Sequence, residues 1–298
     1  MSDISDRFQP GSGSGVVPRE SAAVILARDP ANPASGGELE FFLLRRSSRS
    51  GFMASAFVFP GGIAEPEDAG DLRITAAREL FEEAGILLAS PVVDQTLDEN
   101  TRLAARARVA AGENAQAVLA EHHTHFDVSM LTYFSHWLTP SAEKRRYSAQ
   151  FFVAKLPRGQ HPQFDNVETV DQTWVTAEAA IKQAGKLHLP PPQLRTFYDL
   201  LPAAHSWSLL CEEAQRRGNS KTILLPRFAP LGSGAHSPDN SQPNFALLLP
   251  WDPDYDRLGV GEGISVAPNH PVATGPSRFV LENETWKHID APASSTTA

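Results

Sequence analysis

The chain has 298 residues, enough to bury a large core as one sizeable domain with additions or as two small ones. Its formal net charge of −9, without a Lys/Arg cluster, argues against duplex nucleic acid as a partner. The single Cys211 excludes an internal disulfide framework, and no apolar run approaches the roughly 20 residues of a membrane span. We therefore expect a cytoplasmic protein without nucleic-acid or membrane partners.

Predicted elements begin after a polar tail rich in Gly and Ser at residues 1–18, which we expect to be disordered and which lacks an apolar signal core. The segments SAAVILAR (21–28) and LEFFLLR (39–45) predict two strands joined by a turn region. The short apolar run FVF (57–59) predicts a third strand. It leads into the loop Pro60-Gly61-Gly62, where glycines allow backbone carbonyls to approach a ligand closely.

The next segment, AARELFEEAGILL (76–88), predicts an amphipathic helix that ends at Gly85. Glu79, Glu82 and Glu83 share one face of it, where like charges repel each other. A solvated face would explain such a pattern taken alone. Next to a glycine loop, however, clustered carboxylates suit a hard divalent cation such as Mg²⁺, which would offset the repulsion.

The rest of the chain alternates helical and strand-like segments, which argues for an α/β sandwich. In chain order we expect helices at 95–121, strands at 131–137 and 150–154, a strand ending at Trp174-Val175 with Thr176 capping a helix, a proline-led helix at 189–201, a loop at 229–243, a strand and turn within 244–256 and a hairpin at 278–287. The corresponding domains are a main domain at 19–204 with a helical insertion at about 92–125, and a C-terminal extension at 205–298 that packs on it.

Gly62, Asp68 and the run 78–86 (RELFEEAGI) resemble the Nudix box of Nudix hydrolases, G-x5-E-x7-R-E-U-x-E-E-x-G-U with U aliphatic. The second half matches at every fixed position. Asp68 stands where the pattern has its first Glu, and nine residues rather than seven separate it from Arg78. We assign the extra residues to a loop within 69–77 and no firm role to Asp68. The resemblance implies the Nudix fold of the α+β type, a mixed β-sheet between helices.

Four further segments (45–62, 136–157, 174–200 and 247–256) resemble the Nudix branch that contains the peroxisomal coenzyme A diphosphatases and their bacterial relatives. Other coenzyme A-cleaving Nudix enzymes carry R-[ST]-x3-R-x-H-x-G-[EQ]-x2-F-P-G-G before the box. The ends of that motif match here at Arg46-Ser47 and at FPGG (59–62), but Met53, Ser55 and Ala56 replace its His, Gly and acidic or amide residue.

The resemblance implies a small-molecule nucleotide-diphosphate substrate and favours coenzyme A or an acyl derivative. A nucleotide-sugar or dinucleotide (NADH-type) pyrophosphatase is an alternative. A non-catalytic nucleotide-binding Nudix module is another, which the three intact box carboxylates disfavour. The chain is compatible with a homodimer.

By match to the family, Glu79, Glu82 and Glu83 would hold Mg²⁺ or Mn²⁺, with the Gly61 carbonyl as a further ligand. Arg78 would orient these acidic side chains. In this family the general base can lie inside the box or in a later loop. We choose Glu168, with Asp171 second, because many Nudix proteins place a late acidic residue in this part of the chain. Glu83 and Arg78 complete the catalytic candidates.

The candidate substrate-binding residues are Arg46, Met53, Gly62, Arg145 and Arg146. The arginine pair could meet a phosphate or form a surface pair at a strand edge. Met53 could line a pocket with Gly51 and Phe52 or pack in the core. The three His of 122–125 (HHTH) have no Cys/His partners nearby in the sequence, so we expect no zinc site.

Overall fold

The computed structural model describes residues 15–30, 37–48, 53–91, 97–230, 245–282 and 285–290. An eight-stranded mixed sheet forms its centre, with strand order β10-β7-β8-β1-β2-β3 and with β4 paired to β1 and β9 paired to β2. Most neighbouring strands are antiparallel, but β1 is parallel to β8 and β10 is parallel to β7. The bounds are Arg19–Arg28 (β1), Glu40–Arg46 (β2), Phe57–Val58 (β3), Gly61–Ile63 (β4), Thr132–Leu138 (β7), Tyr147–Lys155 (β8), Thr169–Thr176 (β9) and Ile223–Leu224 (β10).

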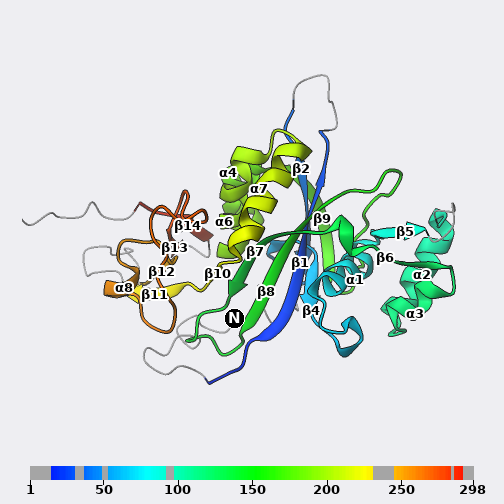
Figure 1. Ribbon diagram of the computed structural model, residues 1–298, viewed down its shortest axis with the longest axis horizontal. Coiled ribbons are helices and arrows are strands. Elements are labelled where there is room, and N and C mark those ends of the chain that lie inside the picture. Colours follow the sequence, from blue (N-terminus) through cyan, green and yellow to red (C-terminus); the bar gives the residue numbers. More distant parts are fainter. Residues whose placement is uncertain are drawn as a thin grey trace, which may run out of the picture.

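Helices cover both faces of this sheet (Figure 1). Along β1, Val24 and Leu26 join one apolar cluster with α1 (Leu72–Ala84), whereas Ile25 and Ala27 join the opposite cluster with α6 (Pro191–Leu200) and α7 (Trp207–Ser220). Successive side chains of a strand point to opposite faces, so a strand covered on both sides is apolar throughout. This explains why the segment 21–28 reads as a continuous apolar run.

The predicted helical insertion follows α1 and consists of α2 (Glu99–Ala110) and α3 (Ala115–Ala120). Asp98 and Asn114 cap the two helices, since each side chain accepts a hydrogen bond from a backbone N–H of the first turn. A two-stranded ribbon, β5 (Ala89–Pro91) with β6 (Thr124–Phe126), closes the insertion. The predicted helices are therefore confirmed, and the ribbon is an addition that the sequence did not indicate.

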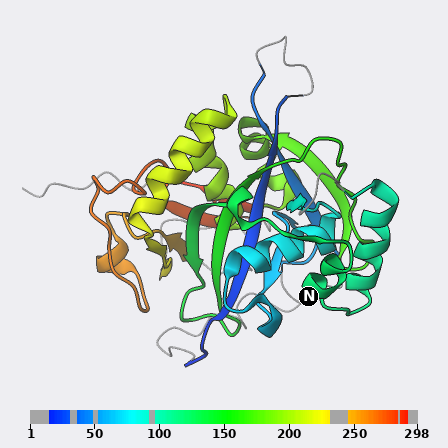
Figure 2. The ribbon, with the colours of Figure 1, turned by 45° about the vertical axis from the view of Figure 1, so that its right-hand side comes forward.

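The chain after residue 205 first completes the central sandwich, because α7 packs on β7 and β10 adds an edge strand. A separate antiparallel sheet follows, made of β11 (Arg227–Pro230), β12 (Phe245–Leu248), β13 (Arg278–Glu282) and β14 (Thr285–His288). Figures 1 and 2 place this second sheet and the helical insertion at opposite ends of the central sheet. The remaining short elements are η3 (Pro66–Asp68), η4 (Val128–Met130), α4 (Ala177–Lys182), α5 (Ala184–Leu187), η5 (Leu201–Ala203) and α8 (Tyr255–Leu258).

A buried ionic network connects helices α6 and α7 with the segment that precedes β13. Asp199 of α6 accepts from Arg195 (2.8 Å) and from Arg217 of α7 (2.6 Å), and all three side chains are almost inaccessible. Arg195 also donates to the carbonyl of Thr274, in the segment before β13. Such a network is costly to break on one side only, so it fixes this segment to the central domain.

Two local predictions are wrong. Residues Gly61–Ile63 form strand β4 against β1 rather than an open loop. The stretch 69–77, predicted as a loop, is helical from Leu72 onward, since Asp71 caps α1. The predicted C-terminal hairpin is confirmed as β13 and β14, and its turn lies outside the described residues.

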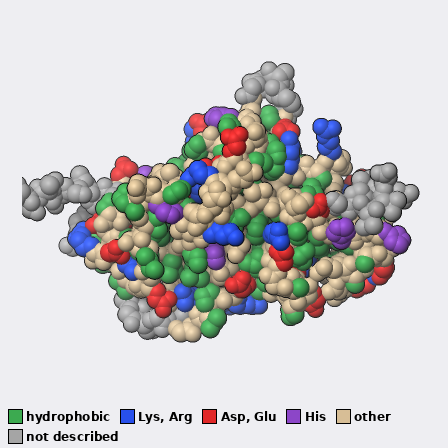
Figure 3. All heavy atoms as spheres, in the orientation of Figure 1, with side chains coloured by type: hydrophobic (Ala, Val, Ile, Leu, Met, Phe, Trp, Pro, Cys, Tyr) green, Lys and Arg blue, Asp and Glu red, His purple; other side chains and the backbone are tan. Residues whose placement is uncertain are grey.

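The polar tail up to residue 14 and most of the predicted loop at 229–243 also lie outside the described residues, and the domain boundary at 204 stays a prediction. Among the helices of the described part, none is long and apolar enough to cross a membrane. On the face shown in Figure 3, acidic and basic side chains are interspersed.

Candidate active site

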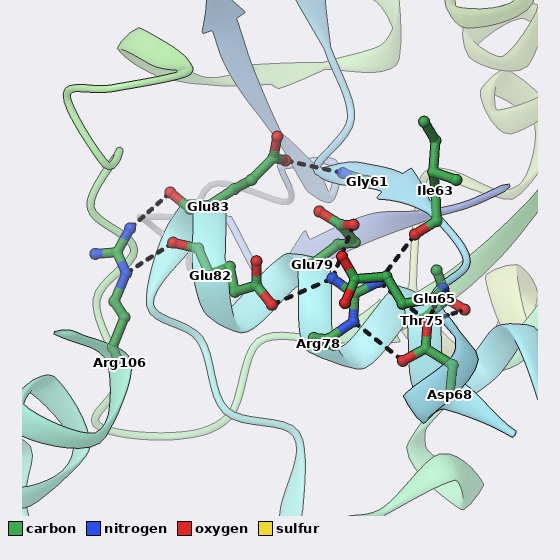
Figure 4. A network of polar contacts seen from close by, with 10 residues as sticks. All are labelled: Gly61, Ile63, Glu65, Asp68, Thr75, Arg78, Glu79, Glu82, Glu83 and Arg106. Atoms are coloured by element: carbon green, nitrogen blue, oxygen red, sulfur yellow. Dashed lines mark hydrogen bonds and ion pairs between the residues drawn. The ribbon is translucent and has the colours of Figure 1, made fainter. Parts of the chain in front are cut away.

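The box helix α1 is held at both ends by local interactions. At its start the Asp71 carboxylate accepts from the Arg73 N–H (3.0 Å), and at its end Gly85 has φ 68°, a left-handed conformation that glycine adopts without strain. Leu80 and Phe81 are fully buried against the sheet. The opposite edge of the helix carries the box arginine and carboxylates toward β4 (Figure 4).

Arg78 lies at the centre of these carboxylates and uses every N–H of its guanidinium. Two donate to the two oxygens of Asp68 (both 3.0 Å) and one to the carbonyl of Ile63 (2.9 Å). Nη1 donates to Glu79 (3.0 Å) and to Glu82 (3.2 Å). The side chain is only 6% exposed. Arg78 therefore orients acidic groups instead of facing the solvent, as the resemblance implies.

Asp68 has a structural role that the sequence did not reveal. It is 1% exposed and also accepts from the Thr75 hydroxyl (2.8 Å) and the Glu65 N–H (3.0 Å). Burial alone would raise the pKa of Asp68, but the hydrogen bonds from Arg78, the Glu65 amide and Thr75 outweigh it and hold the pKa below its ordinary value. Despite the two extra residues, Asp68 is the bidentate partner of Arg78.

The two box glycines are required by close packing. A Cβ on Gly61 would lie 2.4 Å from the Ala22 carbonyl oxygen, and a Cβ on Gly62 would lie 2.3 Å from a carboxylate oxygen of Glu79. The Gly61 N–H donates to Glu83 (2.9 Å). Because the N–H and C=O of one strand residue point to the same edge, we expect the Gly61 carbonyl to lie on the α1 side as well. Its role as a metal ligand stays a prediction.

Glu83 is a buried acid and Glu79 a largely buried one, and the positive charge around them does not offset their own. Burial raises the pKa of Glu79 to about 7, against the attraction of Arg78. Burial, and then the charge of Glu79, raise the pKa of Glu83 well above its ordinary value, although the Gly61 N–H and Arg46 oppose the shift. Burial raises the pKa of Glu82 as well. All three carboxyls would be more stable beside an additional cation.

The donor set fits a hard divalent cation in kind, since it consists of oxygen ligands with excess negative charge. Among the residues that the structure describes, no three Asp, Glu, His or Cys side chains are grouped tightly enough to hold one ion. In this arrangement Arg78 binds Glu79 and Glu82, while Glu83 is turned toward Gly61 (Figure 4). The His residues of 122–125 form no such group either.

Glu168 lies in a loop that is held rigid beside these acids. One oxygen of Asp165 accepts from the backbone N–H groups of Val167 (2.9 Å), Glu168 (3.1 Å) and Thr169 (2.9 Å). The charge of Glu168 is close enough to contribute to the raised pKa of both Glu79 and Glu83. Asp171 instead lies on β9 and accepts from the N–H of Gln172 (2.8 Å). The geometry favours Glu168 over Asp171.

An open cavity of about 540 Å³ adjoins this loop. It combines polar and apolar walls, because Val167 (78% exposed) and Val170 (44% exposed) accompany hydroxyls and charged groups. Its described lining residues are Arg46, Ser47, Ser48, Asn166, Val167, Glu168 and Val170. Arg46 also acts electrostatically on Glu83. The predicted residues Arg46 and Glu168 are thus brought together next to the box.

The other predicted substrate-binding side chains, Met53, Arg145 and Arg146, are not among the described residues that line this cavity. Met53 is half-buried with φ 53°, a conformation that non-glycine residues rarely adopt, and it is absent from the described lining of the cavity. Gly51 and Phe52 lie outside the described residues. Binding of substrate by Met53 therefore stays a prediction.

Arg146 is 7% exposed and has structural partners. It donates to the carbonyls of Thr139 (3.2 Å) and Val16 (3.3 Å), and lies 3.7 Å from a carboxylate oxygen of Glu262. These contacts join three segments distant in sequence. Arg145 is exposed. Substrate binding by the pair stays a prediction, and the contacts of Arg146 favour a structural role.

The substitution Asp68→Asn should lower the free energy of unfolding by roughly 3 kcal/mol, because Arg78 would lose its buried bidentate partner. Chemical denaturation would measure this change. The matched control is Asp71→Asn, three positions along, where asparagine caps the helix about as well as aspartate and only an exposed ion pair with Arg73 is lost, so the cost should stay below about 1 kcal/mol. Equal losses for the two variants would contradict the central role of Asp68.

Glu79→Gln should stabilise the metal-free protein at pH 8 by roughly 1–3 kcal/mol. The pKa of Glu79 is raised from 4.5 to about 7 by folding, so its ionisation destabilises the folded state increasingly as pH rises through that window. Near pH 5 the gain should largely disappear.

Thermal denaturation in the presence of a chelator measures the gain, and Glu178→Gln, at an exposed pair with Lys182, is the control. A variant that is no more stable than the wild type at pH 8 would show that burial of this acid is not costly.

Comparison with known proteins agrees with this geometry. Residues 66–201 match the sequence model of the NUDT19 Nudix domain. The acyl-coenzyme A diphosphatase NUDT19 of Gallus gallus is 29% identical over 255 residues, which cover 61% of this chain and 67% of that protein. The Homo sapiens protein of the same name is 26% identical over 280 residues, covering 69% of this chain and 73% of that protein.

A crystal structure of a NUDIX hydrolase from Alicyclobacillus acidocaldarius superposes with a TM-score of 0.56 at 24% identity, covering 66% of this chain and 97% of that chain. This likeness confirms the predicted Nudix fold, to which the chain adds an antiparallel C-terminal sheet. From the box geometry, the matched segment and the fold, we conclude that this chain has the Nudix fold and that its segment 66–201 is a Nudix domain of the NUDT19 type.

Proposed function

We propose that this protein is a divalent-metal-dependent diphosphatase that hydrolyses a nucleoside diphosphate conjugate, with coenzyme A or acyl-coenzyme A as the preferred class of substrate. The observation that carries the proposal is the group of three box carboxylates, of which Glu83 is buried and Glu79 and Glu82 are partly buried, and whose charge Arg78 offsets only in part. A protein that merely bound a nucleotide would have no use for buried acids that destabilise its fold. The printed names of the two vertebrate relatives support the substrate class.

In this mechanism Glu79, Glu82, Glu83 and the Gly61 carbonyl would hold Mg²⁺ or Mn²⁺. The bound ion supplies screening of the diphosphate charge and activation of water. Arg78 keeps the acidic side chains in place through bonds to Asp68 and to the β4 backbone. Glu168 accepts the proton of the attacking water. The new bond joins the water oxygen to phosphorus, and the P–O bond of the anhydride breaks to leave two phosphomonoesters.

The cavity beside Glu168 would receive the conjugate. Arg46 supplies positive charge for a phosphate, and Ser47 and Ser48 supply polar groups next to it. Val167 and Val170 offer apolar contact of the kind that a pantetheine or acyl arm could use. A substrate with both charged and apolar parts matches such a lining.

A panel of substrates tests the proposal with Mg²⁺ or Mn²⁺ present. We expect coenzyme A and acyl-coenzyme A to yield adenosine 3′,5′-bisphosphate and a phosphopantetheine product, separated by chromatography and identified by mass, and a chelator to stop the reaction. Faster hydrolysis of NADH or a nucleotide sugar would assign the alternative substrate class. Absence of any hydrolysis would leave a nucleotide-binding module.

Glu83→Gln should lower kcat on the preferred substrate by roughly 10²- to 10⁴-fold without loss of the fold. The near-isosteric amide can still accept the hydrogen bond from the Gly61 N–H but lacks the charge for a metal ion. Steady-state kinetics at saturating Mg²⁺ measure the loss, with thermal denaturation as the check on folding. Wild-type turnover in the variant would exclude Glu83 from the metal site.

A further inference from the structure

The helical insertion contacts the box helix at its C-terminal end. Arg106 of α2 donates from Nε to the carbonyl of Glu82 (2.9 Å) and from Nη2 to the carbonyl of Glu83 (2.7 Å), as Figure 4 shows. Arg102, one turn earlier, donates to the carbonyl of Gly85. The carbonyls bound by Arg106 belong to Glu82 and Glu83, two of the three residues whose side chains are predicted metal ligands.

These bonds complete the hydrogen bonding of the end of α1. The last four carbonyls of an α-helix have no partner within the helix and need partners from elsewhere. The Gly85 N–H donates to Phe81 (2.9 Å) and the Gln163 N–H donates to Ala84 (2.9 Å), which leaves the carbonyls of Glu82 and Glu83. Within the described part of the chain, Arg106 is the residue that donates to both. A positive group is also favoured at this negative end of the helix dipole.

The guanidinium of Arg106 packs closely against the C-terminal end of α1. A Cβ on Gly85 would lie 3.0 Å from Nη1 of Arg106, so the left-handed glycine also makes room for it. The charge of Asp165, which holds the Glu168 loop, acts on Arg106 as well. At the other side of the box, Gln116 of α3 donates to the carbonyl of Glu67 (2.8 Å), next to Asp68. The insertion therefore contacts the box at two places, the C-terminal end of α1 and η3.

We infer that Arg106 is a positioning residue for the metal site, and that through it the helical insertion fixes the backbone from which Glu82 and Glu83 project. This inference rests on the proposed function. Without Arg106, two adjacent carbonyls at the buried end of α1 would lose their partners, and the last turn would loosen where the carboxylates must converge. The effect should appear in metal affinity and kcat more than in KM, because Arg106 lies under the helix and not in the described lining of the cavity.

The test compares Arg106→Gln and Arg106→Lys with a control on the same helix. Arg108 is surface-exposed and pairs with Glu113 and Glu121 (both 2.6 Å), so Arg108→Gln removes a charge from α2 without touching α1. Binding of Mn²⁺ is measured by electron paramagnetic resonance, and kcat and KM on acyl-coenzyme A by kinetics. Both are recorded well below the melting temperature of each variant.

We expect Arg106→Gln to weaken Mn²⁺ binding by about 10- to 100-fold and to lower kcat, with KM changed less than about twofold. Arg106→Lys should be intermediate, because one ammonium keeps the charge but not the fork that reaches both carbonyls. Arg108→Gln should resemble the wild type. Should Arg106→Gln fail to fold, Arg106→Lys decides by the same measurements.

Wild-type Mn²⁺ affinity in the Arg106 variants, or an equal loss in Arg108→Gln, would overturn the inference. A wild-type protein that binds Mn²⁺ but cleaves no acyl-coenzyme A would contradict the proposed function instead. In that case the Mn²⁺ arm still decides whether Arg106 positions the site.

Discussion

The buried bidentate bond between Arg78 and Asp68 is the interaction on which the site depends. It ties η3 to α1, and the remaining donors of Arg78 extend the connection to β4 and to two box glutamates. A guanidinium is suited to this place because its planar fork can serve several acceptors at fixed angles and stays charged when buried. Three segments of the box are thereby held in one geometry, with the glycine strand within reach of Glu83.

Arg78 also explains why the acids around it can be buried at all. It binds Asp68 through two bonds, but it must share its remaining N–H groups between Glu79 and Glu82. Among the described residues, the hydrogen bond to the Glu83 carboxylate comes from the Gly61 N–H. The result is a raised pKa for each box glutamate. Acids with a raised pKa lower the stability of the folded state when they ionise near neutral pH. Such acids are typical of sites that bind a cation.

The sequence predicted the parts of this site that are local in the chain. Box spacing and Gly85 indicated the helix and its end, and the apolar run 21–28 indicated a strand. The role of Asp68 was missed because two more residues separate it from Arg78 than the family pattern has. In the structure, α1 begins at Leu72, before the predicted start of the helix, and this helix places Arg78 next to Asp68.

Contacts between distant segments could not be predicted in this way. Arg106 caps α1 from an insertion, and Asp165 shapes the Glu168 loop through three backbone bonds. The one available signal was the pair Arg102 and Arg106, which stand one turn apart on an otherwise Ala-rich helix. Such a pair indicates a basic stripe on the helix. The groups that it binds, the carbonyls at the end of α1, can be identified only from the folded structure.

The central claim is that the box glutamates, removed from water in whole or in part, form the binding site of a divalent cation. Calorimetric titration of Mn²⁺ into metal-free protein at pH 7, repeated in buffers of different ionisation enthalpy, tests it most directly. The account predicts that binding releases protons, because a cation lowers the pKa of Glu79 and Glu83, and that affinity rises between pH 6 and pH 8. Binding without proton release, with an affinity that does not change over this range, would contradict it.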